Sequence, residues 1–227
     1  HVVLMDEVDE SYSGLWMFEE IFNLGGDEEK QKLIEIDEKL KSNDAINIQF
    51  TSGTTGQPKG ATLSHYNIVN NGSLVTDRIK LTEKDRLAIP VPLYHCFGMV
   101  MGVLGAVSKG AAMIFPGESF DPKETLDVLV REKCTALYGV PTMFVAILQE
   151  LNKSSRDLSK MRTGIMAGAP CPIEIMKKVN NVMNMKEVTI CYGMTETAPV
   201  SFQSFVNDPT EKRCKTVGRV HPHLEVK

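Results

Sequence analysis

The sequence lacks a hydrophobic run long enough to cross a membrane. Its most apolar stretch covers residues 97–108 and ends before Lys109, which is short of the roughly 20 residues that a spanning helix needs. No charged segment followed by an apolar run stands at the start, so no secretory signal is recognised. Internal repeats and low-complexity linkers are absent as well. We therefore expect no transmembrane segment, and we expect residues 97–108 to form a buried helix.

Cysteine is scarce, and no two cysteines stand in a C-x-x-C pair. The five cysteines are Cys96, Cys134, Cys171, Cys191 and Cys214. An odd number of scattered cysteines in apolar surroundings favours buried free thiols over disulfides or a zinc site. This predicts a reducing compartment, either the cytoplasm or, in a eukaryote, the mitochondrial matrix.

Clusters of basic residues are also missing. The formal net charge is −4. Residues 1–45 hold 13 acidic and 4 basic side chains, and the remainder holds 16 acidic and 21 basic ones. The basic excess is spread out and has no interleaved aromatics, so we expect no nucleic-acid partner. The acidic lead-in is interpreted as a solvated helix, in which Leu33, Ile36 and Leu40 recur at helical spacing and predict a buried side.

Strand-like and helix-like segments alternate through the rest of the chain. Ser64 is expected to cap a helix, and Asp121 with Pro122 and Glu124 marks the start of another. Further helices are predicted at 142–151 and 172–183. The predicted strands lie at 46–50, 87–92, 111–115, 136–140, 164–168 and 188–193. This alternation predicts an α/β fold with a layered, largely parallel sheet.

Three unusual polar segments follow predicted strands. They are TSGTTGQPKG at 51–60, AGAP at 167–170 and YGMTET at 192–197. Ligands of α/β sheets bind beyond the carboxyl ends of the strands. Each segment is a weak signal by itself, but together they predict one site.

The segment 51–60 has the composition of an anion-binding loop. It is not a Walker A sequence, because Pro58 precedes Lys59 and Gly60 follows it. Its glycines nevertheless allow successive backbone N–H groups to converge on an anion, its hydroxyls add donors, and Lys59 adds a positive charge. The alternative is a flexible hairpin tip, since turns are built from the same residue types.

These segments resemble the signatures of the adenylate-forming superfamily, which includes acyl-CoA synthetases, peptide-synthetase adenylation domains and firefly-type luciferases. TSGTTGQPKG resembles its phosphate-binding signature, YGMTET its Y-G-x-T-E signature, and AGAP its adenine-side turn. LYHCFG at 93–98 is similar to its aromatic-His element beside the acyl pocket. The match runs in order from about residue 46 to 222, and its texture is most like the medium-chain fatty acyl-CoA synthetase branch.

The resemblance implies that ATP activates a carboxylic (fatty) acid as acyl-AMP, and that the acyl group then passes to coenzyme A. Thr195, Glu196 and Lys59 would be catalytic, and Glu196 would hold Mg²⁺. The acyl substrate would meet His95, Phe97, Gly98 and Gly218. The implied ATP-binding residues are Thr51, Ser52, Gly53, Thr54, Thr55, Gly56, Lys59, Gly168, Ala169, Pro170, Tyr192, Gly193, Met194 and Thr195.

Each role has a plain structural alternative. Glu196 can be a cap or a surface carboxylate, and Tyr192 or His95 can be a core side chain. The Met-rich stretch 99–104 is interpreted as core, with an acyl tunnel as the alternative. Cys96 is interpreted as packing, because nothing beside it would activate a thiolate.

The same resemblance predicts that residues 1–227 are the central part of the large N-terminal domain, with 1–45 as a lead-in and 46–227 as the ATP and acyl region. The ribose-binding acid and the mobile C-terminal domain would lie beyond Lys227. We therefore expect weak ATP binding at best and no turnover by this chain alone. Alternatives are an adenylation domain that loads an amino or aryl acid onto a carrier protein, and a non-catalytic nucleotide-binding module. The sequence does not predict an oligomeric state.

Overall fold

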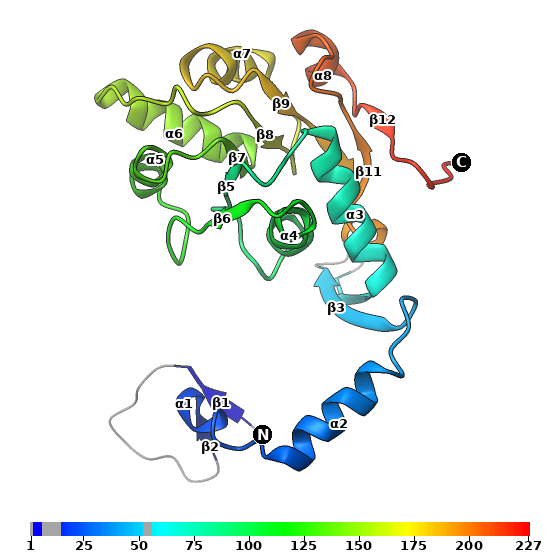
Figure 1. The fold of residues 1–227 in the computed structure, drawn as a ribbon. Helices are drawn as coiled ribbons and strands as arrows, with labels where there is room; N and C mark the ends of the chain where they lie inside the picture. Colours follow the sequence, from blue (N-terminus) through cyan, green and yellow to red (C-terminus); the bar gives the residue numbers. More distant parts are fainter. Residues whose placement is uncertain (1, 6–14, 52–55) are drawn as a thin grey trace. The chain divides into compact units, whose positions relative to one another are not determined.

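The computed structural model describes residues 2–5, 15–51 and 56–227. The chain divides into two compact units, His1–Asp44 and Ala45–Lys227. Figure 1 shows the elements of both units in sequence colours. Within the described ranges, no helix is long and apolar enough to span a bilayer.

The first unit contains a parallel pair of short strands and two helices. β1 (Val2–Leu4) pairs with β2 (Leu15–Met17), and α1 (Phe18–Ile21) and α2 (Asp27–Asp37) follow. The predicted helix is confirmed, but its predicted buried side is wrong. Leu33, Ile36 and Leu40 are 67%, 54% and 50% exposed. Helical spacing shows that a stripe is apolar, but it does not supply the surface that would cover the stripe.

The second unit is built on a five-stranded parallel sheet with the order β6-β5-β7-β8-β9. The strands are β5 (Arg86–Ala88), β6 (Ala112–Ile114), β7 (Ala136–Gly139), β8 (Thr163–Met166) and β9 (Glu187–Thr189). Each of these strands lies inside or overlaps a predicted strand. The α/β prediction is therefore confirmed. The strand order changes direction at β5, because β6 lies on one side of it and β7, β8 and β9 follow on the other side.

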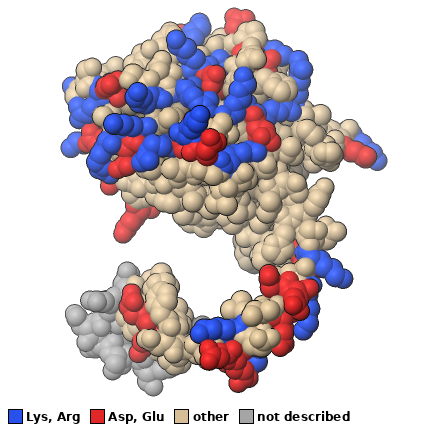
Figure 2. Space-filling view, in the orientation of Figure 1, with Lys and Arg blue, Asp and Glu red and all other residues tan. Residues whose placement is uncertain are grey.

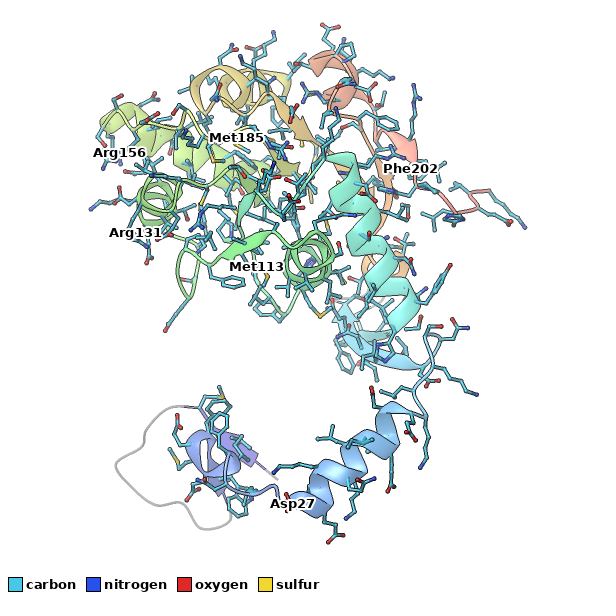
Figure 3. The ribbon with its side chains drawn as sticks, in the orientation of Figure 1. Asp27, Met113, Arg131, Arg156, Met185 and Phe202 are labelled. Carbon is cyan, nitrogen blue, oxygen red and sulfur yellow. The ribbon has the colours of Figure 1, made fainter. Side chains whose placement is uncertain are left out.

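Helices cover both faces of this sheet (Figure 1). One face packs on α5 (Pro122–Arg131), α6 (Pro141–Lys153) and α7 (Ile173–Val182). The other face packs on α3 (His65–Arg78), η1 (Phe97–Leu104) and α4 (Gly105–Lys109). Figure 3 shows Met113 on β6 and Met185 just before β9 within these layers. The side chains that meet in the two cores are mostly Leu, Ile, Val and Met, whose burial drives the assembly.

Two predicted helix caps are confirmed. The hydroxyl of Ser64 accepts the backbone N–H of Asn67 at 3.2 Å, and the carboxylate of Asp121 accepts that of Glu124 at 2.7 Å. Each bond satisfies a donor that the first helical turn leaves free.

The apolar helix predicted at 97–108 is buried as expected, but it is not one regular helix. Residues 97–104 form a π-helix, and α4 completes it. Glycines allow α3 to approach it closely. A Cβ on Gly72 would lie 2.8 Å from the carbonyl oxygen of Val100, and one on Gly105 would lie 2.7 Å from the methyl of Thr76. Wide π-turns inside helices occur frequently at functional sites, and this one begins at Phe97, beside the cavity described below.

Two smaller sheets complete the second unit. β3 (Ala45–Thr51) and β4 (Lys59–Ser64) form an antiparallel hairpin. β10 (Cys191–Gly193), β11 (Val200–Gln203) and β12 (Arg219–Val220) form an antiparallel sheet, and α8 (Thr210–Lys215) lies between its last two strands in sequence. The single strand predicted at 188–193 is therefore wrong. The chain leaves the parallel sheet after Thr189 and pairs elsewhere from Cys191 onward.

An ion-pair cluster ties the amino ends of the parallel strands together. Arg162 grips the carboxylate of Asp85 with two nitrogens, at 2.6 and 3.0 Å, and contacts Glu187 at 2.7 Å. Burial raises the pKa of Asp85, but hydrogen bonds from Arg162 and Thr135 outweigh it and leave the pKa below its usual value. These residues precede or begin β5, β7, β8 and β9, so the cluster fixes the sheet at the edge opposite the cavity.

Charged side chains of both signs are interleaved on the face of the second unit that Figure 2 displays. The same view shows a large uncharged area adjoining them.

Candidate functional site

A cavity of about 820 Å³ lies beyond the carboxyl ends of β8 and β9. The loop that follows β8 and the segment that follows β9 form much of its wall, and residues from the loop after β5 complete it. Its described lining is Thr51, His95, Phe97, Met101, 167–171, 190–196, Pro199, Val200 and 214–217. Members of all three predicted polar segments therefore share one cavity, and so does the predicted aromatic-His element.

The phosphate-loop prediction can be followed only in part, because Ser52, Gly53, Thr54 and Thr55 lie outside the described residues. Thr51, at the end of β3, lines the cavity. Gly56 has a φ of 87°, a conformation that glycine adopts without strain. Lys59 begins β4 opposite Thr51 and is exposed, and it is not among the described lining residues. The hairpin thus brings the start of the loop to the cavity.

Gly168, Ala169 and Pro170 form a turn directly after β8. Gly168 has a φ of 89°, so a side chain there would be strained. The thiol of Cys171 donates to the carbonyl oxygen of Met166 at 3.2 Å and closes the turn. All three predicted residues line the cavity through this short, fixed segment.

Tyr192 opens the second polar segment and lines the cavity. Its side chain is 52% exposed, so the alternative of a core tyrosine is wrong. Its ring centroid lies 6.2 Å from that of Phe202 on β11, at an interplanar angle of 59°. The two rings are neighbours in a tilted arrangement, and an exposed aromatic ring can cover a flat apolar group.

The turn after Tyr192 is held by close backbone contacts. A Cβ on Gly193 would lie only 1.8 Å from the carbonyl oxygen of Pro199. The same oxygen accepts the N–H of Met194 at 3.0 Å and the hydroxyl of Thr197 at 2.6 Å. The 3-10 helix η2 (Thr195–Thr197) follows. These contacts explain why position 193 is a glycine, and Met194 lies on the lining of the cavity.

Thr195 and Glu196 line the cavity together. Glu196 is exposed and is the only carboxylate among the described lining residues. No group of three or more His, Cys, Asp or Glu side chains in the described ranges is arranged to hold a metal by itself. A magnesium ion needs only one or two carboxylates when phosphate oxygens supply the remaining ligands.

His95 is exposed and lines the cavity, so the alternative of a core histidine is wrong. Its Nδ1 accepts the backbone N–H of Phe97 at 3.0 Å. The neutral ring therefore carries its proton on Nε2, which remains available as a donor. Phe97 and Met101, both largely buried, add an apolar surface to the lining.

Cys96 packs in the interior, as predicted. It is fully buried, its thiol donates to the amide oxygen of Gln49 at 2.8 Å, and burial raises its pKa.

Two predicted acyl-contact glycines do not line the cavity. A Cβ on Gly98 would lie 2.3 Å from the carbonyl oxygen of Pro92, and one on Gly218 would lie 2.2 Å from the backbone of Gln203. Close backbone approach therefore accounts for both glycines.

One part of the lining carries no recognisable sequence motif. Cys214, Lys215, Thr216 and Val217 reach the cavity from α8 and the turn after it. The buried Arg213 anchors α8 by donating to backbone oxygens of Lys186 and Val188. Long-range contacts of this kind place the segment, so local pattern could not reveal it.

Comparison with known proteins assigns the chain to a family. The family model described as AMP-binding enzyme matches residues 9–227. The chain belongs to the AMP-binding enzyme family. The predicted membership in the adenylate-forming superfamily is therefore confirmed.

Relatives of this AMP-binding chain include named ligases. It is 46% identical over 216 residues to the acyl-CoA ligase sidI of Aspergillus fumigatus, a match that covers 95% of this chain and 37% of that protein. It is 43% identical over 225 residues to the mitochondrial medium-chain acyl-CoA ligase ACSF2 of Homo sapiens, which covers 97% of this chain and 37% of that protein. The chain thus spans little more than a third of these relatives.

Solved structures share the fold. The N-terminal domain of FACL13 from Mycobacterium tuberculosis has a TM-score of 0.72 and 26% identity, over 81% of this chain and 45% of that one. ATP-bound MatB from Rhodopseudomonas palustris has a TM-score of 0.69 and 30% identity, over 81% of this chain and 35% of that one.

Proposed function

We propose that this chain is the nucleotide- and acid-binding part of an AMP-forming acid–thiol ligase. The ligase would join a carboxylic acid to the α-phosphate of ATP with release of pyrophosphate, and would then pass the acyl group to the thiol of coenzyme A. The observation that carries the proposal is the convergence of Thr51, Gly168–Pro170 and Tyr192–Glu196 on one cavity of about 820 Å³.

The cavity walls suggest how ATP would lie. Adenine would rest between the Gly168–Pro170 turn and the ring of Tyr192, which has Phe202 as a tilted aromatic neighbour. The phosphates would extend toward Thr51, Thr195 and Glu196, because these residues provide hydroxyl donors and a carboxylate on the same lining. ATP-bound MatB shares the fold at 30% identity, which supports a nucleotide as the ligand.

Charge neutralisation would dominate the first step, since the reaction occurs at a phosphate that already carries negative charge. Magnesium would be held by Glu196 together with phosphate oxygens, and the donor set fits that ion. The bound ion would neutralise phosphate charge. Lys59, exposed at the start of β4, would add a second positive charge near the outer phosphates.

The acid would bind beside His95. The Nε2–H of that ring can donate to the carboxylate, because Nδ1 is already occupied by the N–H of Phe97. Phe97 and Met101 would contact an apolar acyl chain. This arrangement would orient the carboxylate toward the α-phosphate.

A fatty acid fits this lining better than an amino acid. A site for an amino acid commonly offers a carboxylate to the substrate amine, and the described lining holds only Glu196, which is assigned to magnesium. The relatives sidI, an acyl-CoA ligase, and ACSF2, a medium-chain acyl-CoA ligase, support an acyl substrate for this chain as well. The cytoplasm or the mitochondrial matrix would suit five free cysteines.

A hydroxamate assay tests the reaction class. The assay would use a protein that contains residues 1–227 and is as long as these relatives. This protein would be incubated with MgATP, hydroxylamine and fatty, aryl or amino acids. We expect hydroxamates of fatty acids, a large loss in Glu196→Gln, and little change in the matched control Glu174→Gln, whose carboxylate is exposed on α7 away from the cavity. Turnover of amino acids alone would contradict the proposal. The isolated chain is expected to bind nucleotide weakly and not to turn over.

A further inference from the structure

One buried amide reaches from α3 to the segment that carries Thr195 and Glu196. Asn71 lies in the middle of α3, which runs beside β11 (Figure 1), and it is only 7% exposed. Its Oδ1 accepts the backbone N–H of Val200 at 3.1 Å, and its Nδ2 donates to the backbone oxygen of the same residue at 2.8 Å. Val200 begins β11 and directly follows the 195–199 turn. Nothing in the proposed reaction gives Asn71 a role.

The two bonds to Val200 have the form of strand pairing. In a β-sheet, two residues that face each other across antiparallel strands can exchange both of their N–H···O bonds. Here the side-chain amide of Asn71 takes the place of the facing residue, with one acceptor and one donor. The amide is neutral, so it satisfies two buried backbone groups without burying a charge. A carboxylate at this position could accept but not donate.

The turn that precedes Val200 is held in a strained conformation. Ala198 has a φ of 70°, in the left-handed region that residues with a side chain seldom adopt. Such a conformation persists only where the surrounding structure determines it. The Nδ2 of Asn71 also lies 3.5 Å from the backbone oxygen of Thr197, at the limit of a hydrogen bond. Contacts of Asn71 therefore stand on both sides of Ala198 in the sequence.

The helix that carries this amide is firmly placed. Gly72, next to Asn71, packs so closely that a Cβ would lie 2.8 Å from the carbonyl oxygen of Val100. α3 also follows directly after β4, the strand that begins with Lys59. One helix thus connects the hairpin of the proposed phosphate loop with the 195–199 turn, although the two are far apart in the sequence.

We propose that Asn71 is a positioning residue of the nucleotide site. Its amide fixes the 195–199 turn and thereby directs Thr195 and Glu196 toward the phosphates and the magnesium of MgATP. The inference rests on the proposed function. Asn71 is not among the described lining residues of the cavity, so it acts through the turn rather than by touching the ligand. Loss of a residue that orients metal-binding groups typically costs about 10- to 100-fold in affinity or activity.

Hydrogen exchange tests the contact itself. Amide exchange and chemical shifts would be recorded by NMR on the ¹⁵N-labelled 227-residue chain without nucleotide. In Asn71→Ala we expect the N–H of Val200 to exchange faster than in the wild type, and the amide signals of Thr195 and Glu196 to move. Asn70→Ala, a matched control at an exposed position of the same helix, should leave these signals unchanged.

Asn71→Asp is the second variant, and it keeps the test usable if Asn71→Ala does not fold. Its side chain has nearly the same size and keeps the acceptor, so the N–H of Val200 should stay protected. Its carboxylate cannot donate to the backbone oxygen of Val200. We therefore expect the signals of Thr195 and Glu196 to move in this variant as well.

Nucleotide affinity separates positioning from stability. Calorimetry would measure the affinities for MgATP and for AMP in the longer protein used for the hydroxamate assay. Both Asn71 variants should bind MgATP about tenfold more weakly or worse. They should lose clearly less affinity for AMP, which lacks the outer phosphates and needs no magnesium. Asn70→Ala should bind both ligands as the wild type does.

The outcomes distinguish this inference from the proposed function. Unchanged exchange of the Val200 N–H in Asn71→Ala overturns the contact, and equal losses of MgATP and AMP affinity overturn the positioning role. If the wild-type protein binds no nucleotide, the proposed function fails. The signals of Thr195 and Glu196 then decide by themselves whether Asn71 fixes the turn.

Discussion

His221 should make the fold sensitive to mild acid. The ring is 2% exposed, and its Nε2 lies 3.0 Å from the amide oxygen of Gln203. The Gln203 amide nitrogen donates to the hydroxyl of Thr189 and to the carbonyl oxygen of Val75, so its oxygen must accept and Nε2 must donate. Nδ1 is buried and has no hydrogen-bond partner among the described atoms. A second proton would therefore be placed on an unpartnered, buried nitrogen.

Burial, with a smaller effect from the nearby Arg78 cation, lowers the pKa of His221 from 6.5 to about 4. The unfolded chain thus takes up the proton at a higher pH than the folded chain does. Stability is fully present above the unfolded pKa and is lost as pH falls from about 6.5 toward 4. Linkage between these two values gives a loss of at most about 2 kcal/mol between pH 7 and pH 5.

Urea unfolding at pH 7 and pH 5 measures this loss. In His221→Gln the amide nitrogen can still donate to Gln203, but nothing titrates, so this variant should lose less stability on acidification than the wild type by about 2 kcal/mol. His223→Asn, at an exposed position, should behave like the wild type. Equal losses in the wild type and His221→Gln would show that protonation of His221 does not cause the loss of stability.

Three further predictions concern the sheet and the cavity. Asp85→Asn should destabilise the chain by about 3 kcal/mol, because it breaks a buried ion pair. Asp127→Asn should cost under about 1 kcal/mol, because its pair with Arg156 is half exposed. Urea unfolding measures both costs, and equal costs would contradict the role of the cluster. Tyr192→Ala should weaken AMP binding about tenfold or more through lost stacking, whereas Tyr192→Phe should bind AMP as the wild type does. Calorimetry measures both affinities, and equal affinities of the two variants would contradict a stacking role. Lys59→Ala should weaken binding of MgATP but not of AMP, and an equal effect on both would argue against a role at the outer phosphates.

Much of the fold could be predicted from local sequence patterns. The caps at Ser64 and Asp121, and the alternation of short apolar strands with longer helices, depend on neighbouring residues and could be predicted. The break between β9 and β10 could not, because 188–193 is uniformly strand-like and only pairing with β11 separates its two halves. The exposed stripe of α2 shows the same limit, since a pattern does not name its partner.

The site followed the same division. Segments at the carboxyl ends of strands were recognisable because their glycine, threonine and proline content is poor material for a core. The cavity confirms that Thr51, Gly168–Pro170 and Tyr192–Glu196 converge. The contribution of 214–217 was missed, since it depends on Arg213 anchoring α8 to the edge of the sheet. Gly98 and Gly218 are explained by backbone contact in the fold.

The most direct test of the central claim is to map where nucleotide binds. The 227-residue chain, labelled with ¹⁵N, would be titrated with MgATP and with AMP while amide chemical shifts are recorded. We expect saturable shifts concentrated at Gly168–Cys171 and Tyr192–Glu196, with Thr51 responding more to MgATP than to AMP. Saturable shifts confined to residues outside this cavity would contradict it.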